Sequence, residues 1–216
     1  MTMGWAPRDC IAVLGAARTY NEAQLTASFR IGQEIGRRGK CLLTGATTGI
    51  PYAAALGAHL EGALVVGISP AGSIEDHLSK YRKPVCQADV LLFTGMGPDG
   101  RSPLILRSAK GAVFVGGELG TLSEFCSGWM CGNNILGILR DAGGVADSIP
   151  EILSKTSTSW GSQVIYEADA TTLASMVCDA VDRTCSIRSS YPRFADPCED
   201  VRNLVARLLE QEAAAR

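Results

Sequence analysis

Glycines, hydroxyl groups and one carboxylate occur together in the segment VFVGGELGTLSEF, residues 113–125. Gly116 and Gly117 end an apolar run, and a third glycine stands directly before Thr121. Backbone amides at the start of a helix bind phosphate groups, and glycines let the backbone approach such a ligand closely. Glu124 follows Thr121 at a spacing that also matches a capping box, in which both side chains only satisfy the helix start. The segment therefore predicts an anion site beside a carboxylate, and a plain helix cap is the alternative.

A similar arrangement occurs in TGATTGIP, residues 44–51. Gly45 and Gly49 allow close approach of the backbone, Thr47 and Thr48 supply hydroxyl groups, and a predicted helix begins at once. A simple turn between a strand and a helix is the alternative. Because both segments follow strands of a predicted parallel sheet, they should lie close together at one edge of it. We expect the two turns to hold one phosphorylated ligand between them.

The elements that position these turns alternate regularly along the chain. Short apolar runs predict strands at 10–16, 40–45, 63–70, 88–95, 111–117, 133–139 and 162–168. Amphipathic stretches predict helices at 21–39, 50–62, 102–110, 121–131 and 170–183. Such alternation is typical of a parallel sheet with right-handed crossovers. We therefore expect an α/β fold with a single doubly wound, mostly parallel sheet and helices on both faces, the Rossmann-like arrangement.

Two parts are expected along the chain. Residues 1–188 are long enough for one Rossmann-like nucleotide-binding domain. Residues 189–216 predict a linker that contains Pro and Ser, followed by an amphipathic C-terminal helix. The apolar residues on one face of that helix are Val201, Leu204, Val205, Leu208 and Leu209. This stripe packs either on its own domain or against a second copy, and we expect a homodimer.

Composition narrows the classes of function. The 216 residues carry 20 basic and 22 acidic side chains and a formal net charge of −2, with no basic run that could follow a nucleic-acid backbone. We therefore expect no nucleic-acid partner. The first residues do not resemble a signal peptide, and the apolar stretches are too short to span a bilayer, so we expect a cytoplasmic protein with no membrane partner.

Cofactor motifs are missing from the sequence. The segment GMGPDG, residues 95–100, matches G-x-G-x-x-G in letters, but the acidic residue expected about 20 positions later is absent. No nucleoside-triphosphate loop occurs, and the eight cysteines include no arrangement with zinc-ligand spacing. We expect neither a metal nor a cofactor.

The glycine-rich segments together resemble a known family. The run GGELGTLSE is similar to the P-G-G-x-G-T-x-x-E signature of the Lonely Guy family and its lysine-decarboxylase-like Rossmann relatives. The resemblance extends from Ile11 to about Arg183 through IAVLGAAR, TGATTGIPYAAALGA, VVGISP, GRSPLILRSAKGAVFVGG and AGGVADSIPEI. It is greatest with the uncharacterised bacterial branch, which carries G-R-N and G-G-x-x-G-T-L-S-E motifs.

This resemblance implies an activity and a set of residues. Active members of the family are phosphoribohydrolases, which cleave a nucleoside 5′-monophosphate into free base and ribose 5-phosphate. Matching positions imply that Arg101 and Glu124 are catalytic. The phosphate cradle carries over to Gly45, Thr47, Gly49, Gly116, Gly117, Gly120 and Thr121. Cleavage builds positive charge on the ribose, which a carboxylate stabilises while it positions water.

Some interpretations stay open at the level of sequence. Arg18, at the end of the first predicted strand, is either a further anion contact or a solvated surface residue. Val115 and Ser102 replace a proline and an asparagine of the family pattern, and Glu118 places a carboxylate inside the phosphate loop. These departures keep two alternatives: a nucleotide-binding or sensing module without turnover, and an enzyme that acts on another phosphorylated metabolite. No lysine lies in the context that a pyridoxal-phosphate decarboxylase requires, so that activity is rejected.

Overall fold

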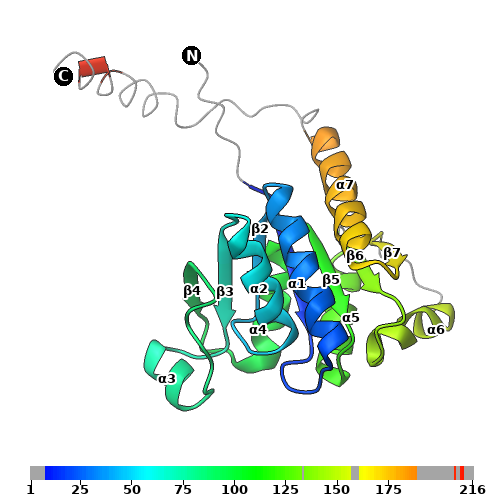
Figure 1. Ribbon diagram of the computed structural model, residues 1–216, viewed down its shortest axis with the longest axis horizontal. Coiled ribbons are helices and arrows are strands. Elements are labelled where there is room, and N and C mark those ends of the chain that lie inside the picture. The colour runs from blue at the N-terminus through cyan, green and yellow to red at the C-terminus, as the bar shows by residue number, and fades with distance from the viewer. Residues whose placement is uncertain (1–7, 133, 157–160, 189–206, 208–209, 212–216) are drawn as a thin grey trace. The chain divides into compact units, whose positions relative to one another are not determined.

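The computed structural model describes residues 8–132, 134–156, 161–188, 207 and 210–211. Within these residues, seven strands form one sheet in the order β4-β3-β2-β1-β5-β6-β7, and every neighbouring pair is parallel (Figure 1). The strands are β1 (Cys10–Gly15), β2 (Cys41–Thr44), β3 (Val65–Ser69), β4 (Val90–Phe93), β5 (Gly111–Val115), β6 (Ile135–Leu139) and β7 (Gln163–Glu167). The chain reverses its winding direction between β1 and β5, where a sheet of this kind opens a crevice at its carboxyl edge. The predicted doubly wound α/β fold is confirmed.

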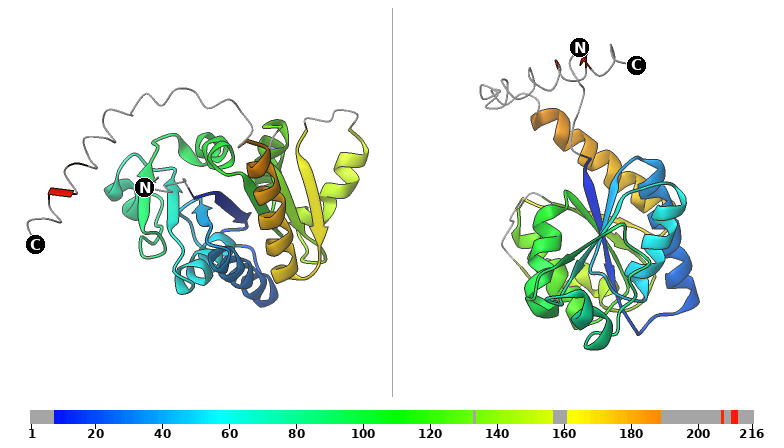
Figure 2. Two further views of the ribbon diagram at one scale, coloured as in Figure 1. Left: turned by 90° about the horizontal axis from the view of Figure 1, so that it is seen from above. Right: turned by 90° about the vertical axis from the view of Figure 1, so that its left-hand side faces the viewer.

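Helices cover both faces of this sheet (Figure 2). They are α1 (Glu22–Arg37), α2 (Ile50–Leu60), α3 (Ile74–Ser79), α4 (Gly97–Ser108), α5 (Leu119–Met130), the 3₁₀ helix η1 (Val145–Ser148), α6 (Ile149–Ser154) and α7 (Ala170–Arg188). One buried cluster joins one face of the strands to α1, α2 and the first part of α7, and the other joins the opposite face to α4, α5 and α6. Since the central strands β1, β2, β5 and β6 are buried on both faces, their sequences are continuous apolar runs rather than alternating ones.

Hydrogen bonds between side chains and backbone fix the start of helix α1. The Asn21 side chain accepts a hydrogen bond from the Gln24 amide at 2.9 Å, and the Gln24 side chain accepts one from the Asn21 amide at 3.1 Å, which is a complete capping box. The fully buried Ile31 and Ile35 lie further along the helix and pack on the sheet. Each such burial contributes about 1.5–3 kcal/mol. The predicted start of the helix after Asn21 is confirmed.

Two helices begin earlier than the sequence pattern predicts. Helix α4 begins at Gly97, so most of the segment 95–100 is helical rather than a loop, and Arg101 lies on a helix. Helix α5 begins at Leu119, with Glu118 as its N-cap residue. The short elements α3, η1 and α6 have no counterpart among the predicted ones. Each contains at most six residues, too few for a 3.6-residue period to be visible.

The contacts divide the chain into two units, Met1–Asp182 and Arg183–Arg216. The first contains the whole sheet. Of the second, the structure describes the last turns of α7 and helical residues at 207, 210 and 211. The five apolar residues of the predicted C-terminal stripe lie outside the described residues, so that prediction is untested. No helix within the described part of the chain is long and apolar enough to cross a membrane.

Candidate functional site

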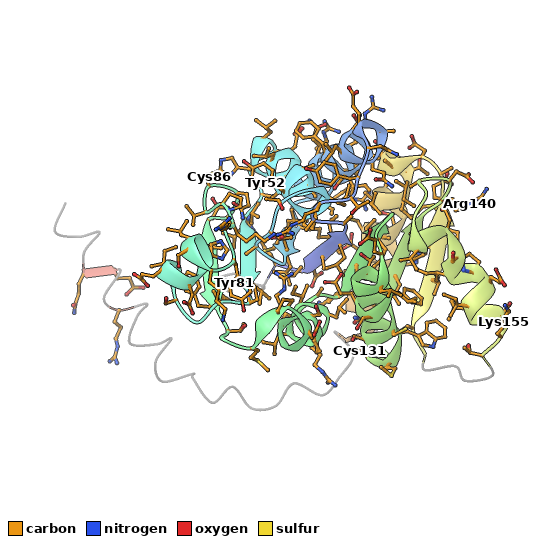
Figure 3. All side chains as sticks on the ribbon, turned by 90° about the horizontal axis from the view of Figure 1, so that it is seen from below. Tyr52, Tyr81, Cys86, Cys131, Arg140 and Lys155 are labelled. Carbon is orange, nitrogen blue, oxygen red and sulfur yellow. The ribbon has the colours of Figure 1, made fainter. Side chains whose placement is uncertain are left out.

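A cavity of about 280 Å³ opens at the carboxyl edge of the sheet, where β1, β2 and β5 end. Figure 3 shows this edge from below, with Tyr81 on the same half of the molecule as Tyr52 and Cys86, away from Arg140 and Lys155. The cavity brings together seven of the residues named from sequence: Arg18, Gly45, Thr47, Arg101, Gly120, Thr121 and Glu124. The other four, Thr48, Gly49, Gly116 and Gly117, lie outside its lining. The two glycine-rich turns therefore meet at one place, but only part of each faces the cavity.

Glu124 is free to face the cavity because it does not cap its own helix. A capping box would need the helix to start after Thr121, whereas α5 starts at Leu119 and its N-cap residue makes no side-chain cap bond. Glu124 therefore lies in the second turn, and its Oε1 accepts a hydrogen bond from the Ser102 hydroxyl of α4 at 3.2 Å. The helix-cap alternative for Thr121 and Glu124 is wrong.

Charge and burial act against each other on this carboxylate. Burial raises the pKa of Glu124, and the Arg101 charge and the Ser102 hydrogen bond lower it by smaller amounts. Burial also lowers the pKa of Arg101, against the opposing effect of Glu124 and Tyr81. Among the described residues, no direct ion pair joins the two side chains. Each charged group is thus removed from water without a close partner of opposite charge.

The Arg101 side chain is fixed by packing rather than by an acid. Its Nη1 donates to the carbonyl of Ile68 at the end of β3 at 3.3 Å, and its buried Nε has no partner among the described atoms. The guanidinium lies so close to Gly45 that a Cβ added there would be 2.3 Å from Nη1. A side chain at position 45 would displace the guanidinium, so glycine there leaves room for Arg101.

The two glycines at the end of β5 pack inside the protein and do not line the cavity. Gly116 and Gly117 have φ values of 57° and 87°, in the region that favours glycine. A Cβ on Gly116 would be 2.5 Å from the Gln24 amide nitrogen, and one on Gly117 would be 2.2 Å from the Thr121 hydroxyl. Their carbonyls accept the amides of Ala146 and Val145. The pair thus joins α1, α5 and η1 by close contacts inside the protein.

The start of α2 also has fewer backbone amides free to bind an anion than the sequence suggests. The Ile50 amide donates to the Ala16 carbonyl at 3.0 Å, and Pro51 has no amide hydrogen. The Thr48 hydroxyl donates to the Ala17 carbonyl at 2.8 Å, and Gly49 packs against the same β1–α1 loop. The first amides of α5, by contrast, have no acceptor within their helix, and Gly120 and Thr121 line the cavity. Amides for an anion are therefore available at α5 rather than at α2.

Lys83 lies just outside the cavity lining, and sequence reasoning did not single it out. Its Nζ donates to the Thr48 hydroxyl at 3.5 Å, and its pKa is lowered by burial and by the charges of Arg18 and Arg101. Lys83 lies in the irregular β3–β4 connection, which carries no recognisable motif. His77 fixes this connection. The fully buried imidazole bonds the Ser69 hydroxyl at 2.8 Å and the Pro84 carbonyl at 3.1 Å.

The cavity lining contains both basic and acidic side chains. The basic ones are Arg18 and Arg101; Lys83 lies outside the lining but close enough for both of these charges to act on it. The acidic ones are Asp99 on α4, Glu118 at the N-cap of α5 and Glu124 on α5, of which Asp99 and Glu118 are exposed to solvent. A ligand that carries an anionic group and a second group that gains positive charge would match this mixed lining. The described residues contain no cluster of acidic, histidine and cysteine side chains suited to a metal ion.

Comparisons with known proteins give a family and a shared fold. Residues 8–174 match the model of the SLOG cluster4 family. An uncharacterised protein of Archaeoglobus fulgidus is 34% identical over 116 residues, which are 53% of this chain and 69% of that protein. The molybdenum cofactor binding protein of Rippkaea orientalis has a TM-score of 0.64 at 23% identity, over 83% of this chain and 98% of that one.

A further solved structure bears on the expected partners. It is the DNA processing protein A of Helicobacter pylori, described for its single-stranded DNA binding mode. Its TM-score is 0.55 at 13% identity, over 80% of this chain and 81% of that one. Both structural matches are alike in fold alone, and this fold does not exclude nucleic acid. The expectation of no nucleic-acid partner therefore depends on charge only and stays a prediction.

Proposed function

Since the chain belongs to the SLOG cluster4 family, we propose that its cavity binds a nucleoside 5′-monophosphate and hydrolyses the N-glycosidic bond to give free base and ribose 5-phosphate. The observation that carries the proposal is the partly buried Glu124 in the lining of a cavity that Arg18 and Arg101 also line. A raised pKa on a carboxylate in a cleft, explained by burial, is typical of functional sites.

The reaction follows from these charged groups. With the phosphate bound by the basic side chains, the sugar lies toward Glu124, whose carboxylate stabilises the positive charge that develops on the ribose as the bond to the base breaks. Glu124 also accepts a proton from the attacking water, so that hydroxide adds to the sugar carbon as the bond to the base breaks. The departing base takes up a proton from solvent, to which Glu124 releases its own, so the net change is the addition of one water molecule. Arg101 binds oxygen atoms of the phosphate or of the ribose through its fork of donors.

The size of the cavity supports a small phosphorylated sugar as the enclosed group. Pockets for small molecules usually measure about 300–1,000 Å³, and this one has about 280 Å³. A ribose phosphate fits such a volume, and the base would extend toward the opening. The base therefore makes fewer enclosed contacts than the sugar and the phosphate.

Removal of the Glu124 charge tests this proposal. The purified protein is incubated with a panel of nucleoside monophosphates, and free base is separated by chromatography. We expect Glu124→Gln to lower kcat about 10²- to 10⁴-fold, because the general base is lost, while the fold is kept. Glu151→Gln is the matched control, since Glu151 is an exposed residue whose carboxylate pairs with Lys155. If the wild-type protein releases no base from any monophosphate, the hydrolase proposal is wrong.

The second candidate is a binding or carrier module that uses the same cavity without turnover. The Ser102 hydrogen bond to Glu124 and the exposed carboxylate of Glu118 beside the glycine turn favour it, because both departures from the family pattern lie at the reacting end. The shared fold with a molybdenum cofactor binding protein is consistent with such a role. Binding of a monophosphate without release of base would support this candidate over the first.

A further inference from the structure

Lys83 stands in an environment that lacks an acidic partner. Within the described residues its ammonium group forms no ion pair, and its hydrogen bond is to the hydroxyl of Thr48 at 3.5 Å. The side chain is partly buried, and the charges that act on it, from Arg18 and Arg101, are positive. Three cations gathered in this way repel one another, so an anion between them would relieve the repulsion.

Arg101 gives a second, independent indication of a missing partner. Its Nε is buried and has no acceptor among the described atoms, although a buried donor normally has one. Its Nη1 donates to a backbone carbonyl, and Gly45 leaves room for the guanidinium. The side chain is therefore held in place beside the cavity, and its Nε–H remains available to donate to a ligand.

The glycine turn after β5 is less suited to bind the phosphate than the sequence resemblance implies. Gly116 and Gly117 are enclosed by Gln24 and Thr121, and neither lines the cavity. Glu118 follows them directly and does line the cavity, where its charge repels an anion. The amides of α5 reach the cavity only at Gly120 and Thr121, beside that carboxylate.

We propose that Lys83, from just outside the cavity lining, forms the phosphate subsite together with Arg18 and Arg101 in that lining, at the ends of β1, β2 and β3 rather than at the glycine turn after β5. This inference rests on the proposed function and specifies its substrate class. The three cations and the carboxylate of Glu124 leave two positive charges, which a phosphate monoester balances as a dianion and a phosphodiester does not. Asp99 and Glu118 also line the cavity, but both are exposed, so water screens their charges.

His77 acts on this subsite as a positioning residue. Its backbone carbonyl accepts the Lys83 amide at 3.1 Å, and its ring bonds the carbonyl of the next residue, Pro84. The imidazole also bonds Ser69 at the end of β3, so the connection that carries Lys83 is fastened to the sheet beside the cavity. The ammonium group is thereby held near Arg18 and Arg101 without any direct contact to an acid.

Titration calorimetry with ribose 5-phosphate tests the subsite. Loss of one charged contact should weaken the affinity of Lys83→Met for ribose 5-phosphate about 10- to 100-fold, and Lys83→Arg should restore part of it. Lys155→Met removes the same charge from an exposed position on the far half of the molecule and should bind like wild type. The melting temperature without ligand shows whether each variant is folded. The 5-phosphate methyl ester of ribose, with one charge fewer, should bind wild type more weakly.

The outcomes separate this inference from the proposed hydrolysis. Equal affinity of folded Lys83→Met and wild type for ribose 5-phosphate would overturn the subsite, even if wild type releases base. Binding that depends on Lys83 without any release of base would support the subsite and count against hydrolysis. If wild type binds neither ribose 5-phosphate nor any monophosphate, both proposals are wrong.

Discussion

At the scale of single residues, the site depends on groups that are buried without full compensation. Glu124 and Arg101 lie on neighbouring helices and influence each other's pKa, yet neither closes an ion pair with the other. In a direct ion pair, each side chain would neutralise the other, and fewer of their donor and acceptor atoms would remain for a ligand. The hydroxyl of Ser102 holds Glu124 from the side, in a position where the family pattern has an asparagine. Ser102 is therefore the residue through which the pKa of Glu124 is most simply changed.

A pH profile tests this relation. Glu124 must be ionised to act as a base, so activity should appear as the pH rises through its pKa, which burial places above the ordinary glutamate value. The Ser102 hydrogen bond lowers that pKa. Ser102→Ala should therefore move the acidic limb of kcat to higher pH, whereas Ser79→Ala, in an exposed position on α3, should leave it unchanged. An acidic limb that stays in place in Ser102→Ala would contradict the assignment of this limb to Glu124.

At the scale of elements, the alternation of strands and helices could be predicted because each depends on local sequence. The family match confirms the resemblance on which the site residues were named. The start of α5 was not predictable from sequence. The Thr121–Glu124 spacing matches a helix cap two residues later, and Leu119, which is exposed in the structure, does not belong to the apolar face of the helix. Lys83 was missed because its place depends on the contacts of His77 with β3, which no local pattern reveals.

The contact between the β2–α2 turn and α4 gives a prediction at this scale. Gly45→Ala should push the Arg101 guanidinium out of place, because the new Cβ would lie 2.3 Å from Nη1. We expect about tenfold weaker binding of ribose 5-phosphate, measured by calorimetry, with a melting temperature close to that of wild type. Gly72→Ala is the control, since its Cβ would meet nothing closer than 3.8 Å. Unchanged binding in Gly45→Ala would show that Arg101 does not contact the ligand.

At the scale of the whole molecule, the sheet has one incompletely covered margin. The edge strand β4 is apolar throughout, and Val90, Leu92 and Phe93 are 42%, 51% and 37% exposed. Parallel sheets are normally covered on both faces, and exposed edges promote association. This margin is one candidate surface for self-association, and the C-terminal stripe predicted from sequence is another.

Light scattering on two variants separates these sources. We expect the full chain to be a homodimer, and Leu204→Ser combined with Leu208→Ser to give monomers, because the predicted stripe is interrupted. Leu92→Lys should keep the dimer and lower aggregation at high concentration, because the added charge opposes edge pairing. A monomeric wild-type protein would contradict the expected homodimer. A monomeric Leu92→Lys variant would indicate that the dimer contact lies at β4.

The strand order has a consequence for how the protein is made. Gly15 pairs with Val115 although about half of the chain separates them, so the basic groups are synthesised well before the helix that carries Glu124. A nascent chain that has emerged only as far as α4 would hold the cations without their opposing acid. The proposed phosphate subsite would therefore be complete in sequence before β5 is made, whereas the acid that hydrolysis needs is added only with α5.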